Sequence, residues 1–157
     1  MAAGDGVFNV AMGVWRTLAG LPATNDALII VLLKAAGIPA EATLRDFATL
    51  ADVLASAADE ADFTGYARKT LTSGITITQD NVNERVDGDI PDQEWNPAGG
   101  AVNNTLGKLL ICYDPDTTVS GDNTVIPLTY HNFSVTTDGN PLQARVASAG
   151  FVRSAAS

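Results

Sequence analysis

The sequence predicts an α+β protein in which two N-terminal helices precede an antiparallel β-sandwich or jelly-roll-like domain. Early in the chain, apolar runs lie between helix-capping and helix-ending residues, and later short strand-like runs alternate with turn dipeptides. The stretch from Phe63 to Thr78, FTGYARKTLTSGITIT, marks the change between the two patterns. We therefore expect residues 1–60 to form an arm and two helices, and residues 61–157 to form the sandwich, packed as one compact unit.

An apolar, glycine-interrupted segment from Gly4 to Leu21 opens the chain and predicts an extended arm or strand. Such an arm either packs on its own domain or reaches a neighbouring subunit, and pairing within one sheet is the commoner outcome. If the arm reaches a neighbour, its candidate interface residues are Val7, Phe8, Val10 and Trp15.

The first predicted helix carries the run DALIIVLLKAA. Thr24 or Asn25 can cap its start, and Gly37 followed by Pro39 can end it. Apolar residues from Leu28 to Leu33 would cover every side of this helix. The helix would therefore be the buried centre of the domain, or one of its sides would meet another subunit.

The second predicted helix starts at Thr43, where Asp46 lies at the position of a capping-box partner. One apolar stripe at helical spacing consists of Leu44, Phe47, Leu50, Ala51 and Leu54. We expect this amphipathic helix to cover the sheet or the first helix. Its polar face is acidic, which argues against a membrane role.

Short strand-like runs separated by turn residues fill the rest of the chain and favour a sandwich. The predicted strands are Tyr66–Leu71, Ile75–Gln79, Asn83–Val86, Gly107–Tyr113, Thr124–Leu128, Phe133–Thr136, Leu142–Val146 and Phe151–Arg153. Pro127 lacks a backbone N–H, so we expect it at a sheet edge or a bulge.

The composition excludes several classes of function. The net charge is −9, which argues against nucleic-acid binding, and only 17% of residues are charged, which suits permanent contacts. Cys112 is the single cysteine, which excludes an internal disulfide, and its apolar surroundings predict an inert buried thiol. The N-terminus lacks a signal-peptide pattern, and the longest apolar run, Ala27–Leu33, is too short to span a bilayer. We therefore expect a soluble protein made in cytoplasm.

No residue pattern predicts an enzyme, a cofactor or a metal site. His131 is the single histidine and has no nucleophile motif near it, so a solvated or hydrogen-bonded loop residue is expected. The acidic groups at 80–94 and 114–122 could offer oxygen ligands to calcium, but neither has the spacing of a calcium loop. Acidic loops that keep the protein soluble are the alternative. Arg68 and Lys69 point to opposite faces of a strand and are further candidate interface residues, with an internal salt bridge as the alternative.

Four segments carry a resemblance to a known group of proteins. The segments are GYARKTLT before the ITIT strand, TLRDFATLADVL, LGKLLICYD and IPLTYHNFSVTTDG. Together they resemble small structural proteins of tailed bacteriophages of actinobacteria, over most of the chain from Gly4 to Arg153. The resemblance implies a place in a phage particle.

We therefore expect a non-enzymatic virion protein that binds the outer capsid surface as a decoration or minor capsid protein and reinforces the shell. Its partners would be the phage major capsid protein and further copies of itself, for example in a trimer, with no nucleic acid and no membrane. It would be made in the host cytoplasm and reside on the virion. The alternatives are a minor tail, head–tail connector or fibre-base component and, in another class, a carbohydrate-binding module displayed on the virion.

Overall fold

A computed structural model describes residues 4–155 of the 157-residue chain. The chain is mostly β, with three antiparallel sheets and a few short helices. This confirms that the chain forms antiparallel β-structure. The elements, in chain order, are β1 (Gly6–Val7), η1 (Asn9–Ala11), α1 (Trp15–Ala19), β2 (Ala27–Lys34), α2 (Glu41–Leu44), α3 (Leu50–Ala55), β3 (Lys69–Leu71), β4 (Thr76–Asp80), β5 (Arg85–Asp89), β6 (Gln93–Trp95), β7 (Thr105–Asp114), β8 (Ile126–Thr136), β9 (Leu142–Ala144) and β10 (Val152–Ala155).

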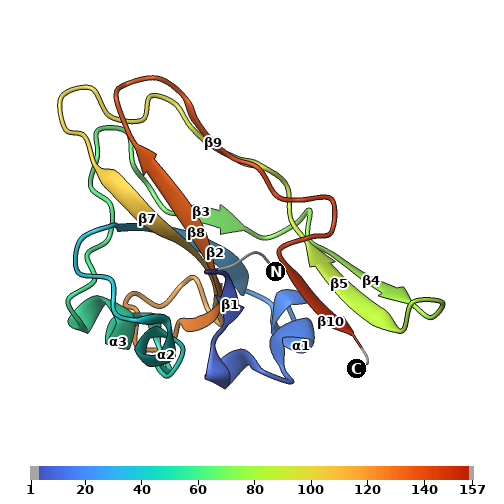
Figure 1. Cartoon of the computed structure of the whole chain (residues 1–157). Helices are drawn as coiled ribbons and strands as arrows, with labels where there is room; N and C mark the ends of the chain where they lie inside the picture. The colour runs from blue at the N-terminus through green and yellow to red at the C-terminus, as the bar shows by residue number, and fades with distance from the viewer. Residues whose placement is uncertain (1–3, 156–157) are drawn as a thin grey trace.

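The large sheet has the strand order β1-β8-β7-β2-β3 and buries apolar side chains on both faces (Figure 1). One face packs against α1 and the smaller sheets, and its core includes Trp15, Ile30 and Phe151. The other face packs against α2 and α3, and its core includes Phe8 and Leu50. Strands buried on both faces must be apolar throughout, and this requirement explains the composition of β2 and β7.

The first predicted helix is wrong, because its residues form strand β2 at the centre of the large sheet. Seven of the eight residues from Ala27 to Lys34 are buried, and the strand pairs with β7 along its whole length. An apolar run of this length fits a strand covered on both faces as well as it fits a buried helix. The sheet joins residues before and after position 60, so the two predicted parts share one core.

The second predicted helix is interrupted, and its capping box lies six residues further along the chain than expected. Helix α2 ends at Leu44, and α3 begins at Leu50 after Thr49 as the N-cap. The Thr49 side chain accepts a hydrogen bond from the Asp52 N–H, and the Asp52 carboxylate accepts one from the Thr49 N–H, both at 3.1 Å. This reciprocal pair satisfies two free amides and begins a new helix.

Strand β8 joins two predicted strands into one. It runs from Ile126 to Thr136, so His131 lies within a strand and not in a loop. Pro127 lies opposite Cys112, where the pairing with β7 shifts register, which confirms the expectation of a bulge. Strand β6 was not predicted, although it positions the buried Trp95 by pairing with β9.

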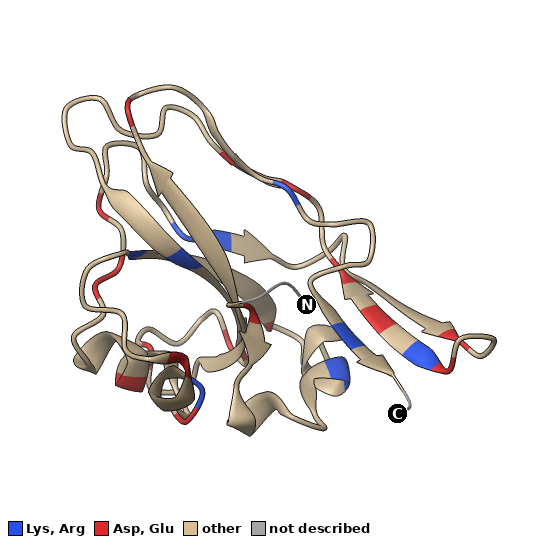
Figure 2. Ribbon diagram, viewed as in Figure 1, with Lys and Arg blue, Asp and Glu red and all other residues tan. Residues whose placement is uncertain are grey.

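The smaller sheet, β10-β5-β4, has one apolar face and one charged face. Trp15 packs against the apolar face at Gly88, where an added Cβ would lie 2.9 Å from the indole ring. The Trp15 indole N–H donates to the Ser154 hydroxyl at 2.9 Å. The β4–β5 hairpin extends away from the large sheet (Figure 1), and Figure 2 colours the positions of its charged residues along the ribbon.

Candidate functional site

The N-terminal arm, residues 4–21, packs on its own domain. Gly6 and Val7 form β1 and pair with Tyr130 and Thr129 of β8, as the intramolecular interpretation expects. Phe8 is fully buried, and its ring meets Tyr130 edge to face at a centroid distance of 5.4 Å. Trp15 is 4% exposed. Phe8 and Trp15 therefore stabilise the fold and do not present a surface to a partner.

Between these two anchors the arm exposes an apolar ridge, which we define as Val10, Met12 and Val14. Their exposed fractions are 38%, 56% and 44%. Phe8 belongs to the core on one face of the large sheet and Trp15 to the core on the other, so the ridge lies where the chain passes between the faces. Figure 2 shows no charged residue from β1 to the start of α1. Of the predicted interface residues on the arm, only Val10 belongs to this ridge. Met12 and Val14 were not predicted, although the apolar residues at every second position from Val10 to Val14 could have indicated them.

Arg68 is occupied within the chain, as the salt-bridge alternative expects. Its guanidinium donates to both Glu60 oxygens, at 2.8 and 2.6 Å, and to both Asp122 oxygens, at 2.5 and 2.9 Å. Glu60 also accepts the Tyr66 hydroxyl at 2.8 Å. Hydrogen bonds to these two carboxylates raise the pKa of Arg68 above its ordinary value, and burial of the guanidinium partly offsets this rise. The network ties three loop segments together.

Two lysines are also held inside the fold. Lys69 lies over the ring of the buried Trp95, 5.2 Å from the centroid. Lys108, which is 6% exposed, was not singled out in the sequence. Its ammonium group donates to the Gly4 carbonyl at 2.5 Å, to Asn132 at 2.7 Å and to Glu41 at 3.2 Å. This buried cation fastens the start of the arm to β8 and α2.

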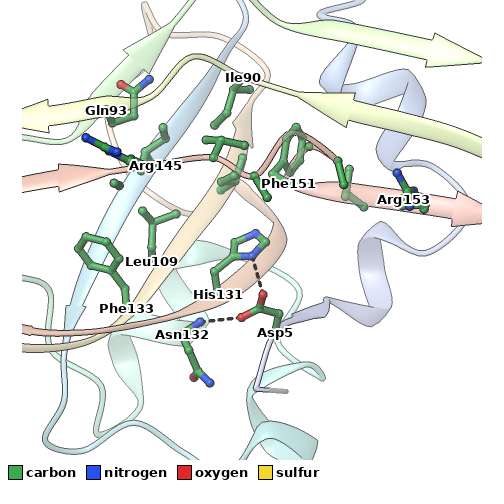
Figure 3. A pocket seen from close by; sticks show the side chains of 18 residues that line it. Asp5, Ile90, Gln93, Leu109, His131, Asn132, Phe133, Arg145, Phe151 and Arg153 are labelled. Atoms are coloured by element: carbon green, nitrogen blue, oxygen red, sulfur yellow. Dashed lines mark hydrogen bonds and ion pairs between the residues drawn. The ribbon is translucent and has the colours of Figure 1, made fainter. Parts of the chain in front are cut away.

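A cavity of about 390 Å³ lies between the large sheet and the segment from Ala144 to Arg153. Figure 3 shows Leu109 and His131 on the sheet side and Phe151 on the opposite side. The volume and the mostly apolar lining both fall within the range of small-molecule sites.

His131 reaches this cavity within a chain of polar contacts. Its Nδ1 lies 3.5 Å from the Asp5 carboxylate, and its Nε2 lies 2.9 Å from the Thr129 hydroxyl. The order Asp, His, Thr is that of a catalytic triad. Thr129, however, is fully buried and does not line the cavity, so its hydroxyl cannot meet a substrate there. The contacts fix the arm to β8, where the Asn132 N–H also donates to Asp5 at 2.8 Å.

We expect the unfolding free energy to fall as the pH drops from 7 towards 5. Burial lowers the pKa of His131 below its ordinary value of 6.5, with Asp5 opposing the shift. The unfolded chain therefore binds a proton more readily in this window, and proton uptake favours unfolding. His131 is the single histidine, so urea unfolding at stepped pH isolates its contribution. A variant with His131→Gln should show a flatter profile, and an equal slope in both proteins would contradict the assignment.

The acids of the two predicted groups are held by local contacts, and Arg85 pairs with both Asp80 and Asp87. Asp80 accepts the N–H groups of Val82 and Asn83, Asp87 pairs with Arg153, and Asp122 pairs with Arg68. Within residues 4–155, no group of three or more His, Cys, Asp or Glu side chains could hold a metal ion. The helices in that range are all too short or too polar to cross a membrane.

Comparison of the chain with models of protein families, with curated proteins and with solved structures finds no match.

Proposed function

We propose that this chain is a non-enzymatic structural protein of a tailed-phage virion, bound to the outer surface of the capsid as a decoration or minor capsid protein. The segments that resemble phage virion proteins support this proposal by their position in the fold. LGKLLICYD falls on β7 and IPLTYHNFSVTTDG on β8, the two longest strands of the large sheet. The similar segments thus contain many of the buried residues of the large sheet. Proteins that share a fold are expected to be similar in such residues.

The apolar ridge of Val10, Met12 and Val14 is the observation that carries the proposal. These three exposed side chains lie within five residues of one another, and exposed apolar side chains that lie close together mark interaction sites more often than scattered ones do. Phe8 and Trp15 anchor the two ends of the segment, so little conformational freedom is lost when the ridge binds a partner. We assign this ridge to the contact with the major capsid protein.

The remaining surface suits a protein on a crowded shell. The chain carries a net charge of −9, which limits unwanted association of copies outside the particle. We also propose that the large sheet and the smaller sheets form the two layers of a β-sandwich. Many weak contacts repeated over a symmetric shell give strong total binding even when each copy binds modestly.

Met12→Asp should weaken binding to capsids that lack the protein by at least about tenfold, because it places a charge at the centre of an apolar contact. The measurement is co-sedimentation of the purified protein with such capsids over a range of concentrations. Val119→Asp is the matched control, since Val119 is also exposed, at 54%, but lies far along the chain from the ridge. Both variants should unfold within about 0.5 kcal/mol of the parent protein. Equal binding by the two variants would exclude the ridge as the contact.

The number of copies per particle separates the capsid from other locations. A decoration protein should be present at on the order of hundreds of copies, because it follows the capsid symmetry. A connector, minor tail or fibre-base component should be present at a few to tens. Gel densitometry of purified particles against the major capsid protein measures the ratio, and a low ratio would contradict the proposed location. Binding of the isolated protein to a glycan array would instead favour the carbohydrate-binding alternative.

A further inference from the structure

Strand β4 is an open edge of the smaller sheet. The order of that sheet is β10-β5-β4, so β4, from Thr76 to Asp80, pairs with β5 on one side. Within residues 4–155 no strand pairs with its other side. Alternate N–H and C=O groups of β4 therefore face outward and can bind another strand.

This edge lacks three of the usual protections against pairing. Edge strands are commonly blocked by lysine, proline or a bulge, and the sequence TITQD contains neither residue. The pairing of β4 with β5 keeps one register from Thr76 to Asp80. The hairpin extends away from the large sheet, so the edge can be reached by another molecule (Figure 1).

The tip of the same hairpin presents one apolar side chain on a stiff turn. Val82 is 91% exposed, more than any other large apolar residue described. One Asp80 oxygen accepts the N–H groups of Val82 and Asn83 at 3.1 and 3.0 Å, and the other accepts the Asn83 amide at 2.7 Å. Glu84 adopts a left-handed φ of 50°. These contacts fix the backbone of the turn at Val82, so less conformational freedom is lost when a partner binds there.

We propose that β4 pairs antiparallel with β4 of a second copy of this chain, about a two-fold axis at Thr78. In this register Thr78 faces Thr78 of the second copy. Ile77 then faces Gln79, and Thr76 faces Asp80, so no two like charges lie opposite each other. Directly opposed threonines are a favourable cross-strand pair, whereas opposed like charges are not.

The same register gives the exposed valine a partner. The strand register ends at Asp80, and it brings the hairpin tip, which carries Val82, towards the segment that precedes β4 in the second copy, where Gly74 lies. Within each chain, Gly74 lies against Pro91, where an added Cβ would be 3.1 Å from the proline ring. Because the axis is two-fold, this apolar contact forms once at each end of the interface.

The arrangement places the two bodies at opposite ends of the interface. The large sheet lies at the base of the hairpin, away from its tip, so antiparallel hairpins place the two bodies at opposite ends (Figure 1). The interface is small, so the dimer should be weak and reversible in solution. This inference does not rest on a virion role, although repeated contacts of this kind would add to binding on a lattice.

Sedimentation equilibrium of the full chain tests the interface. The parent protein should form a reversible dimer at high concentration. Thr78→Lys places two ammonium groups opposite each other and should raise the dissociation constant at least about tenfold. Val82→Ser should also raise it, because each dimer loses two apolar contacts. Ser134→Lys, on the exposed side of β8, is the control and should leave it unchanged.

A cysteine variant tests the register independently. Cys112 is buried, so Thr78→Cys introduces the one accessible thiol of the described chain. With oxidised glutathione as the oxidant, it should form a disulfide-linked dimer faster than Val119→Cys does. Equal rates for the two variants would overturn the proposal. A chain that stays monomeric, or a dimer unaffected by Thr78→Lys, would overturn it as well.

Discussion

Phe8→Ala should lower the free energy of unfolding by about 3 to 4 kcal/mol, the usual cost of removing a buried aromatic side chain. Phe8 is fully buried, packs edge to face on Tyr130, and donates its backbone N–H to the Leu128 carbonyl at 3.0 Å. The alanine side chain would leave a cavity under the arm and remove the aromatic pair. Urea unfolding, followed by circular dichroism, measures the change.

Val10→Ala is the matched control, two residues along the same segment. Its side chain is 38% exposed, so we expect a loss within about 0.5 kcal/mol. The pair separates two interpretations of the arm. If Phe8 faced a partner and not the core, both substitutions would leave the stability of the isolated protein almost unchanged.

Arg68→Met should lower the free energy of unfolding by about 2 kcal/mol. Breaking a buried ion pair costs more than this, but the side chains of Arg68, Glu60 and Asp122 are 22–30% exposed, and solvent screens part of the interaction. The loss arises because Glu60 and Asp122 would remain close to each other without the cation between them. Thermal and urea unfolding at pH 7 measure the effect.

Arg68→Lys tests the geometry of this network. Lysine keeps the charge but cannot bind two carboxylates as a planar fork, so its stability should lie between those of the parent and Arg68→Met. The control is Arg145→Met, because Arg145 is exposed and donates to the nearby Gln143. A loss for Arg145→Met as large as that for Arg68→Met would show that removal of any arginine has this effect.

Much of the strand pattern could be predicted because strands with one solvated face alternate along the sequence. The predicted runs around Ile75, Asn83 and Leu142 overlap β4, β5 and β9, whereas the buried run around Gly107, which overlaps β7, was bounded by turn residues. The bulge at Pro127 follows from its missing N–H. A helix was predicted for the run that forms β2, Ala27–Lys34, because a segment buried on all sides shows no alternation that would distinguish a strand from a helix.

The candidate site was predicted in part. Apolar composition identified the N-terminal arm as a candidate interface, and two adjacent basic residues did the same for Arg68 and Lys69. For the arm, the alternative was packing on its own domain. For the two basic residues, it was an internal salt bridge. The apolar side chains that point outward are those at the place where the arm passes from one face of the large sheet to the other. No local sequence pattern predicts where the arm does this. The partners of Lys108, namely Gly4, Glu41 and Asn132, come from three separate segments.

The sequence by itself determined the antiparallel β character of the later chain, the acidic charge and the buried thiol, because these depend on composition and on contacts between near neighbours. Only the tertiary structure decided that β2 is a central strand, that Phe8 and Trp15 are core residues, and that Val10, Met12 and Val14 form an exposed ridge. These outcomes depend on pairing between residues far apart in the chain. The cores on both faces of the large sheet decide which side chains are buried.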